Sequence, residues 1–298
     1  MHATKVFMVK PVRFGFNNQT AEDNPFQKRG FGDDAQKNAL REFMAAVSLL
    51  KANGITVVMA EDTIVPHTPD SLYPRGWFST HRDGTLVIYP MAMPNRRAER
   101  KSEFIDAIRK DFSVKRIVDL TYWDEEEQYL EGTQSLVLDR DARIAYACRS
   151  SRTSEKVLAD FCRQMGYSPM AFDAVDRSGN PVCHTNQMLF LGSSFALVCL
   201  ETVQSQEQRS ALEEALKKGG RVIITVSPEQ MEHFVTDIVE LENALGRKFL
   251  VMSGTARKSL SAEQTRILGT RCRILSPELD YIENNGGGSV GSMVAELC

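Results

Sequence analysis

The sequence lacks any apolar run long enough to cross a membrane, and residues 1–11 contain no stretch long enough for a signal peptide. It also lacks an excess of basic residues, since 36 Lys and Arg stand against 39 Asp and Glu, a formal net charge of −3 with His neutral. Five His do not change that balance, so no basic surface for nucleic acid is expected. These absences predict a cytoplasmic protein that binds neither membranes nor nucleic acid.

Paired cysteine motifs are absent as well. The six cysteines are Cys148, Cys162, Cys183, Cys199, Cys272 and Cys298. No two of them form a CxxC pair, so a zinc site is not expected. The first four lie in apolar runs, which is typical of reduced, buried thiols in a reducing compartment. A chain of 298 residues buries enough apolar surface to fold without disulfides or a structural metal.

What the sequence does contain is a recurring helix–strand unit. In residues 35–53 the apolar side chains fall three and four apart, one face of an amphipathic helix: Leu40, Phe43, Met44, Val47 and Leu50. Gly54 ends that helix, and residues 55–59 read as a buried strand.

Further helices are predicted over residues 102–112, 154–165 and 205–218, after Ser227-Pro228, and after a capping box at Ser261–Gln264. Predicted strands cover residues 85–89, 114–120, 136–138, 144–148, 188–191, 195–200, 221–226 and 271–275. With no long linker, five or so such units indicate an α/β protein. It is either an open, doubly wound sheet or a closed propeller, and periodicity alone does not separate the two.

The glycine-rich stretch Gly286–Gly291 satisfies G-x-G-x-x-G. A dinucleotide site, however, needs a helix and a second strand after that motif, and only seven residues follow Gly291. The stretch is therefore interpreted as a flexible turn, or as a loop whose backbone approaches a ligand and which leads into a short buried strand over residues 293–297.

Seven blocks, in order along nearly the whole chain, resemble those of the citrulline-utilisation hydrolases, which are bacterial amidinotransferase-like proteins: Met8–Glu22, Pro69–Trp77, Tyr89–Arg100, Glu131–Thr133, Ser150–Thr153, His184–Met188 and Gly286–Glu296. That family belongs to the pentein superfamily, together with arginine deiminase and dimethylarginine dimethylaminohydrolase. The resemblance implies one domain over residues 1–298, a five-bladed α/β propeller of pseudo-symmetric repeats. It favours the closed propeller over the open sheet.

The resemblance also implies a chemistry. A guanidinium or ureido carbon is a poor electrophile, so its hydrolysis needs a strong nucleophile, carboxylates that fix the cation, and an acid for the departing nitrogen. In the family a cysteine attacks and forms a covalent intermediate, and no metal or organic cofactor is required. His184 matches the family's proton-transferring histidine, Glu131 and Asp70 its cation ligands, and Arg152 the residue that holds the substrate's carboxylate.

The sequence departs from the family pattern at the same site. Ser292 stands where the family has its cysteine, after Gly291 where arginine is common. Arg75-Gly76 replaces Asn-Asn, so a polar ligand near the substrate is lost at Gly76, and Gln134 replaces a usual glycine. A serine hydroxyl is a far weaker nucleophile than a thiolate, so slow hydrolysis or none is expected.

Two other cysteines are candidates to replace the nucleophile. Cys298 lies six residues after Ser292, roughly 20 Å along a strand. Cys183 adjoins His184, and neighbours on a strand point to opposite faces, so neither thiol is expected to serve. One engineered Cys→Ser change would explain Ser292 alone, whereas natural divergence also explains Gly76 and Gly291, and we favour divergence.

Two functions from different classes follow. The first is a hydrolase of deiminase or amidinohydrolase type, acting on C–N bonds of arginine, citrulline or a related compound. The second is a catalytically inactive pentein that binds a guanidino ligand, with binding that weakens in Glu131→Gln, or a protein partner. The sequence leaves open which of these holds, which substrate is used and whether the chain forms a homo-oligomer.

Overall fold

Within residues 3–298, which the computed structural model describes, the strands form five separate three-stranded sheets. In each sheet the middle strand pairs antiparallel with one neighbour and parallel with the other, the parallel partner following a helix. The sheets are β15–β1–β2 (Ala295–Glu296, Lys5–Lys10, Thr56–Glu61), β3–β4–β5 (Phe78–Thr80, Thr85–Ile88, Arg116–Asp119), β6–β7–β8 (Val137–Asp139, Ile144–Cys148, Ser168–Phe172), β9–β10–β11 (Leu189–Leu191, Phe195–Val198, Val222–Thr225) and β12–β13–β14 (Val239–Glu242, Lys248–Val251, Arg273–Leu275).

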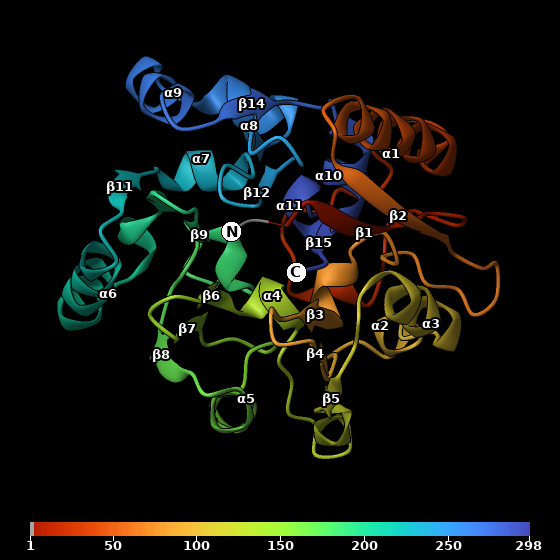
Figure 1. Cartoon of the computed structure of the whole chain (residues 1–298), viewed down its shortest axis with the longest axis horizontal. Coiled ribbons are helices and arrows are strands. Elements are labelled where there is room, and N and C mark those ends of the chain that lie inside the picture. The colour runs from red at the N-terminus through yellow and green to blue at the C-terminus, as the bar shows by residue number, and fades with distance from the viewer. Residues whose placement is uncertain (1–2) are drawn as a thin grey trace.

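The sheets stand as blades in a ring, with the longer helices on the outside (Figure 1). The helices that cross from a middle strand to its parallel partner are α1 (Ala35–Ala52), α2 (Pro94–Arg97), α3 (Ser102–Asp111), α5 (Glu155–Met165), α6 (Gln206–Lys218), α8 (Gly254–Ser259) and α9 (Ala262–Gly269). The strands β3, β6, β9, β12 and β15 lie nearest the centre of the ring and are called the inner strands below (Figure 1). Five separate sheets in a ring confirm the closed propeller rather than the open sheet.

Short helices and turns lie between the blades. These are η1 (Thr20–Glu22), η2 (Pro74–Gly76), η3 (Thr121–Asp124), α4 (Gly132–Ser135), η4 (Thr185–Gln187), η5 (Leu200–Thr202), α7 (Pro228–Glu232), α10 (Asp280–Gly286) and α11 (Val290–Met293). Four of them, η2, α4, η4 and α11, come directly before an inner strand. Because equivalent ends of the blades meet around one axis, the side chains of these segments converge near the centre of the ring.

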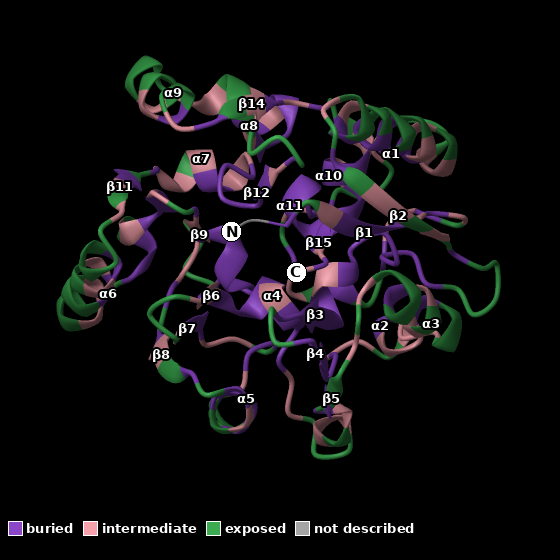
Figure 2. Cartoon of the chain, in the orientation of Figure 1, coloured by how far each residue is buried: buried purple, intermediate pink, exposed green. Residues whose placement is uncertain are grey.

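The hydrophobic core follows the blades. The middle strands β4 and β10 are buried at every residue, because a helix covers one face and the neighbouring blades cover the other. Figure 2 shows the inner part of the ring as buried and the outward faces of the helices as exposed. In the part of the chain that the structure describes, we find no helix that combines the length and apolar character needed to span a bilayer.

Local signals place most element boundaries where the sequence predicts them. Gly54 and Gly166 adopt positive φ (81° and 68°) at the ends of α1 and α5, and Ser261 forms the predicted capping box with Gln264. Three expectations are wrong in detail. The strand predicted as buried over residues 55–59 is β2, in which every residue is half-buried or exposed. Met44 is 38% exposed, because the buried face of α1 is centred on Phe43, Val47 and Leu50. The strand predicted over residues 293–297 is reduced to β15, because α11 takes up residues 290–293.

Candidate active site

A buried acid–histidine pair lies where α4 and η4 begin. His184 Nε2 lies 2.7 Å from Glu131 Oε2, and both side chains are buried. The Nη1 atoms of Arg152 and Arg96 lie 3.5 Å and 3.7 Å from the same carboxylate oxygen. Although burial raises the pKa of Glu131, these cations hold it well below its usual range. Glu131 is therefore an ionised partner that orients His184.

Glu131 is one step removed from the predicted position. The small central cavity between the blades is lined by His184, Arg96 and Arg152, and Glu131 lies behind them. The sequence predicted that Glu131 would contact a bound cation directly. In this structure the side chains of His184, Arg96 and Arg152 lie between the Glu131 carboxylate and the cavity.

Asp70 lines the cavity and has one carboxylate oxygen that accepts no hydrogen bond from residues 3–298. Its Oδ2 accepts hydrogen bonds from Asn17 Nδ2 (2.7 Å) and Thr20 Oγ1 (3.0 Å). Its Oδ1 has no hydrogen-bond partner among the described residues, although the residue is only 2% exposed. Burial raises the pKa of Asp70, which the nearby Arg96 opposes. A buried, unsatisfied acceptor of this kind is uncommon and suits a ligand that donates hydrogen bonds.

Arg152, predicted to hold a substrate carboxylate, already holds one from the chain itself. Its guanidinium binds the carboxylate of Asp23 through two nitrogens, with Nε 3.0 Å from Asp23 Oδ2, and Nη2 donates to the carbonyl oxygen of Thr20 (2.9 Å). The side chain is 1% exposed. A ligand carboxylate would have to compete with Asp23 for this arginine.

Ser292 is held by a carboxylate that sequence reasoning missed. Its Oγ lies 3.0 Å and 2.9 Å from the two carboxylate oxygens of Asp237, and Asn186 Nδ2 lies 2.9 Å from Asp237 Oδ1. The N–H of Ser289 donates to Asp237 Oδ2 at 2.6 Å. Burial raises the pKa of Asp237. Asp237 sits in an ordinary apolar run, residues 234–241, so no local signal in the sequence marks it.

The departures from the family pattern touch one another. The Nη1 of Arg75 donates to the carbonyl oxygen of Gly291 at 2.9 Å, next to Ser292. A Cβ on Gly76 would lie 2.6 Å from Gln134 Oε1 and 2.9 Å from Arg96 Nη2, so Gln134 fills the space that any side chain at residue 76 would need. Four of the five changed residues, all but Ser292, thus form two contacting pairs, as expected of mutual adjustment rather than independent loss.

The argument from strand alternation does not apply to Cys183, although Cys183 is not among the residues that line the cavity with Ser292. Residues 182–184 are not a strand, and Cys183 Sγ lies 3.7 Å from His184 Nδ1 and 3.4 Å from Gln187 Oε1. Although burial raises the pKa of Cys183, His184 and Arg152 lower it overall. Burial lowers the pKa of His184, but Cys183 and Glu131 raise it to about 9. Cys298 lies in a different cavity from Ser292, as expected.

The cavity itself is narrow. Its volume is about 20 Å³, room for roughly one water molecule. Gly286, Gly287 and Gly288 form one wall, and a Cβ on Gly286 would lie 2.3 Å from the Tyr73 hydroxyl. The glycine-rich stretch is therefore a close backbone approach rather than a nucleotide-binding turn. Among residues 3–298 we find no cluster of three His, Cys, Asp or Glu that could hold a metal ion.

Comparison with known proteins agrees with this architecture. A family model described as "N,N dimethylarginine dimethylhydrolase, eukaryotic" matches residues 10–298. Among curated proteins, no relative matches the chain.

Several solved structures share the fold at low sequence identity. The N-terminal domain of ArgZ, described as an arginine dihydrolase from the ornithine-ammonia cycle in cyanobacteria, is 13% identical with a TM-score of 0.77, over 98% of this chain and 97% of that one. DDAH from Pseudomonas aeruginosa is 15% identical with a TM-score of 0.69, over 99% of this chain and 100% of that one. The chain spans 40% of the longer ArgZ chain. The pentein fold predicted from the sequence is confirmed.

Proposed function

Because the chain belongs to the N,N-dimethylarginine dimethylhydrolase family, we propose that its central cavity binds a guanidino or ureido compound and that the protein is a hydrolase of the C–N bond in that group. One observation carries the proposal. Asp70 Oδ1 and Asn186 Oδ1 are buried acceptors without partners among the described residues, and both residues line the cavity that also contains His184 and Ser292. A guanidinium group supplies N–H donors to two such acceptors at once.

The solved relatives support this class of ligand. The ArgZ N-terminal domain was crystallised as a Cys-to-Ser mutant bound to its substrate, and the Pseudomonas protein as a Cys-to-Ser mutant complexed with citrulline. Both have serine in place of a mutated cysteine, as Ser292 replaces the family cysteine here. Serine in these relatives is thus compatible with ligand binding.

In the proposed reaction Ser292 is the nucleophile, and Asp237 and His184 transfer the protons. The Ser292 oxygen attacks the guanidinium carbon while its proton passes to Asp237, and the C–N bond breaks as His184 protonates the departing amine. Water then attacks the serine-bound carbon and gives one proton to His184, which restores the imidazolium. Asp237 returns its proton to the Ser292 oxygen as the carbon–oxygen bond to serine breaks, and the ureido product leaves after losing the second water proton to the released amine or to solvent. A carboxylate is a weak base toward a hydroxyl group, so this step is slower than attack by a thiolate.

Entry of the ligand requires the cavity to widen. Phe234 lines both the cavity and an outer pocket of about 320 Å³, and its ring packs on that of Phe26 at 5.4 Å between centroids. Phe234 also holds φ at 59°, which is unusual for a bulky residue. We propose that these two rings separate to admit the ligand.

The test is incubation with L-arginine, dimethylarginine and L-citrulline, with assays for ammonia, dimethylamine, citrulline and ornithine. The natural chain is expected to give slow turnover, and Ser292→Cys faster turnover by at least about tenfold. Asp70→Asn in the Ser292→Cys background serves as a matched control and should raise KM. Absence of turnover in Ser292→Cys would refute the hydrolase, and absence of binding as well would refute the proposed class of ligand.

A second candidate function is that of a catalytically inactive protein that binds a guanidino ligand. It is suggested by Arg96 and Arg152, the two buried cations beside Glu131. Arg96 and Arg152 already neutralise Glu131, so fewer carboxylates remain for a ligand. This function predicts that calorimetry detects saturable arginine binding that weakens in Asp70→Asn, with no product even from Ser292→Cys.

A further inference from the structure

Each cation that lines the narrow cavity already has a carboxyl partner in the chain. His184 lies beside Glu131, as described above. Arg96 donates from Nε and Nη2 to the two carboxyl oxygens of Glu99, at 3.1 Å and 3.2 Å. Within the described part of the chain, the basic side chains of this cavity are those two and Arg152. A ligand carboxylate would therefore have to displace a carboxyl group of the protein.

Asp23 occupies the donors of Arg152 that would bind a substrate carboxylate. Nε and Nη2 both donate to Asp23, and Nη2 also donates to the Thr20 carbonyl oxygen. The remaining nitrogen, Nη1, lies 3.5 Å from Glu131 Oε2. Although burial raises the pKa of Asp23, Arg152 lowers it overall, so Asp23 is ionised at neutral pH. A ligand carboxylate at Nη1 would be repelled by both Glu131 and Asp23, and contacts between like charges weaken binding.

The outer pocket beyond Phe234 does not favour a carboxylate either. The ionisable side chains that line it are Lys28, Arg177, His233, Asp176, Glu232 and Glu283. Arg177 pairs with Glu232 at 3.2 Å, and Lys28, the remaining cation, is exposed. Burial raises the pKa of Glu283 to about 7, and a cationic group beside it would favour its ionised form. This pocket therefore suits an uncharged or cationic group better than a carboxylate.

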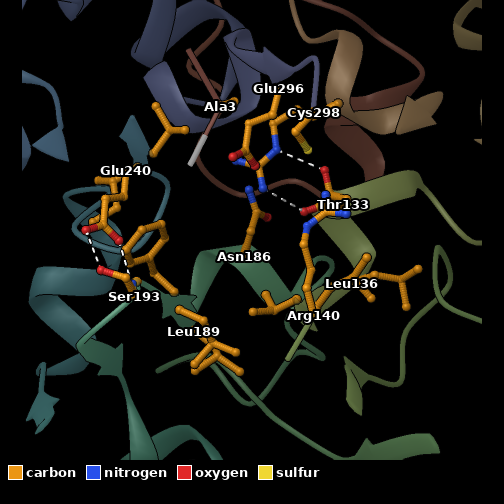
Figure 3. A pocket seen from close by; sticks show the side chains of 18 of the residues that line it. Ala3, Thr133, Leu136, Arg140, Asn186, Leu189, Ser193, Glu240, Glu296 and Cys298 are labelled. Carbon is orange, nitrogen blue, oxygen red and sulfur yellow. Dashed lines mark hydrogen bonds between the residues drawn. The ribbon is translucent and has the colours of Figure 1, made fainter. Parts of the chain in front are cut away.

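The cavity on the other side of Asn186 is balanced in charge. It is lined by residues of the inner strands β6, β9, β12 and β15, and its volume is about 160 Å³. Figure 3 shows Arg140 and Glu296 on one side of it and Ser193 and Glu240 on the other. Its lining arginines are Arg75, Arg82, Arg140 and Arg221, and the carboxylates that line it or pair with them are Asp139, Asp141, Glu240 and Glu296. Four carboxylates against four arginines leave no excess positive charge to attract a ligand carboxylate.

We infer that the site prefers an alkylguanidine without a carboxylate, and that Asp23 sets this preference by occupying Arg152. The inference rests on the proposed binding of a guanidino group at Asp70 and Asn186, and it narrows the class of ligand. Asp23 is not among the residues that line the narrow cavity, so it acts through Arg152 and is a positioning residue. Its removal should change which ligand is preferred rather than abolish binding.

The experiment is calorimetric titration of the natural chain with 4-aminobutylguanidine and with L-arginine, which differ only in the α-carboxylate. 4-Aminobutylguanidine should bind at least about tenfold more tightly. In Asp23→Ala, Arg152 has two donors available for a carboxylate, so the affinity for arginine should rise by about tenfold or more. The affinity for 4-aminobutylguanidine should stay the same. Asp23→Glu keeps a carboxylate beside Arg152 and should keep the preference of the natural chain.

The matched control is Glu263→Gln, which removes the partner of Arg266 from an exposed ion pair on α9 and should change neither affinity. Lys28→Gln should leave the affinity for arginine unchanged, whereas a tenfold loss would show that Lys28 holds the carboxylate and would overturn the inference. Unchanged arginine affinity in Asp23→Ala would also overturn it.

The comparison of the two ligands on the natural chain needs no variant, so it decides the inference even if Asp23→Ala does not fold. Equal or tighter binding of arginine would overturn the preference and leave the proposed function standing. If neither ligand binds, the proposed class of ligand fails together with the inference.

Discussion

Ser292 illustrates how a neighbouring carboxylate sets the reactivity of one residue. In Ser292→Cys the new thiol would lie beside Asp237, whose negative charge disfavours the thiolate and raises the thiol pKa. We therefore expect Ser292→Cys, Asp237→Asn to react with iodoacetamide at neutral pH about tenfold faster than Ser292→Cys alone. Mass spectrometry of the alkylated peptide measures the rate at residue 292. Equal rates would show that Asp237 exerts no such effect.

At the same scale, Cys183 should control the protonation of His184. Because Cys183 and Glu131 raise the pKa of His184 to about 9, the imidazole should remain protonated at neutral pH. Cys183→Ser removes the sulfur beside Nδ1 and should lower that pKa, leaving Glu131 as its partner. NMR titration of the imidazole resonances provides the measurement. Cys148→Ser is the control, since Cys148 Sγ bonds the Val182 carbonyl and not His184; a similar shift there would contradict the assignment.

At the scale of elements, the segments between blades tolerate little added volume. In Gly286→Ala the new Cβ would lie 2.3 Å from the Tyr73 hydroxyl, which bonds the carbonyl oxygens of Ile282 and Gly288. We expect this change to lower the free energy of unfolding by about 1–3 kcal/mol through overpacking. Gly269→Ala, at the end of α9 with no atom within 4 Å of its Cβ, should cost nothing. Urea denaturation of both variants makes the comparison, and equal midpoints would refute the argument.

The elements themselves were largely predictable, because their signals are local. Ser261 with Gln264, and the glycines at residues 54 and 166, fix helix ends through neighbours a few residues away. The residues that sequence reasoning missed act across the ring. Asp237 meets Ser292, and Arg75 meets Gly291, only after separate blades have come together. The contact of Cys183 with His184 could not be predicted, because strand alternation does not apply where the chain is irregular.

At the scale of the whole molecule, a neutral histidine buried between blades couples stability to pH. Burial, followed by Arg140, lowers the pKa of His81 from 6.5 to about 3. Below about pH 6.5 the unfolded chain binds a proton at His81, whereas the folded protein binds it only below about pH 3. The free energy of unfolding therefore falls as pH drops through that window. The expected contribution is on the order of a few kcal/mol.

His81→Gln should remove that contribution. Urea denaturation between pH 4 and pH 7 should show a shallower dependence of unfolding free energy on pH in the variant than in the natural chain. Parallel curves would mean that His81 does not titrate differently on unfolding.

The pairing of β15 with β1 sets the order in which the functional parts form. The bridges Val6–Glu296 and Phe7–Ala295 join opposite ends of the sequence, so their loop-closure cost is the largest of any pairing in the ring. Ser292 directly precedes β15, so the candidate active site is completed in the same late step. Four blades can therefore form before that site is complete, and we expect affinity for the proposed ligand to appear all at once, when the last strand docks.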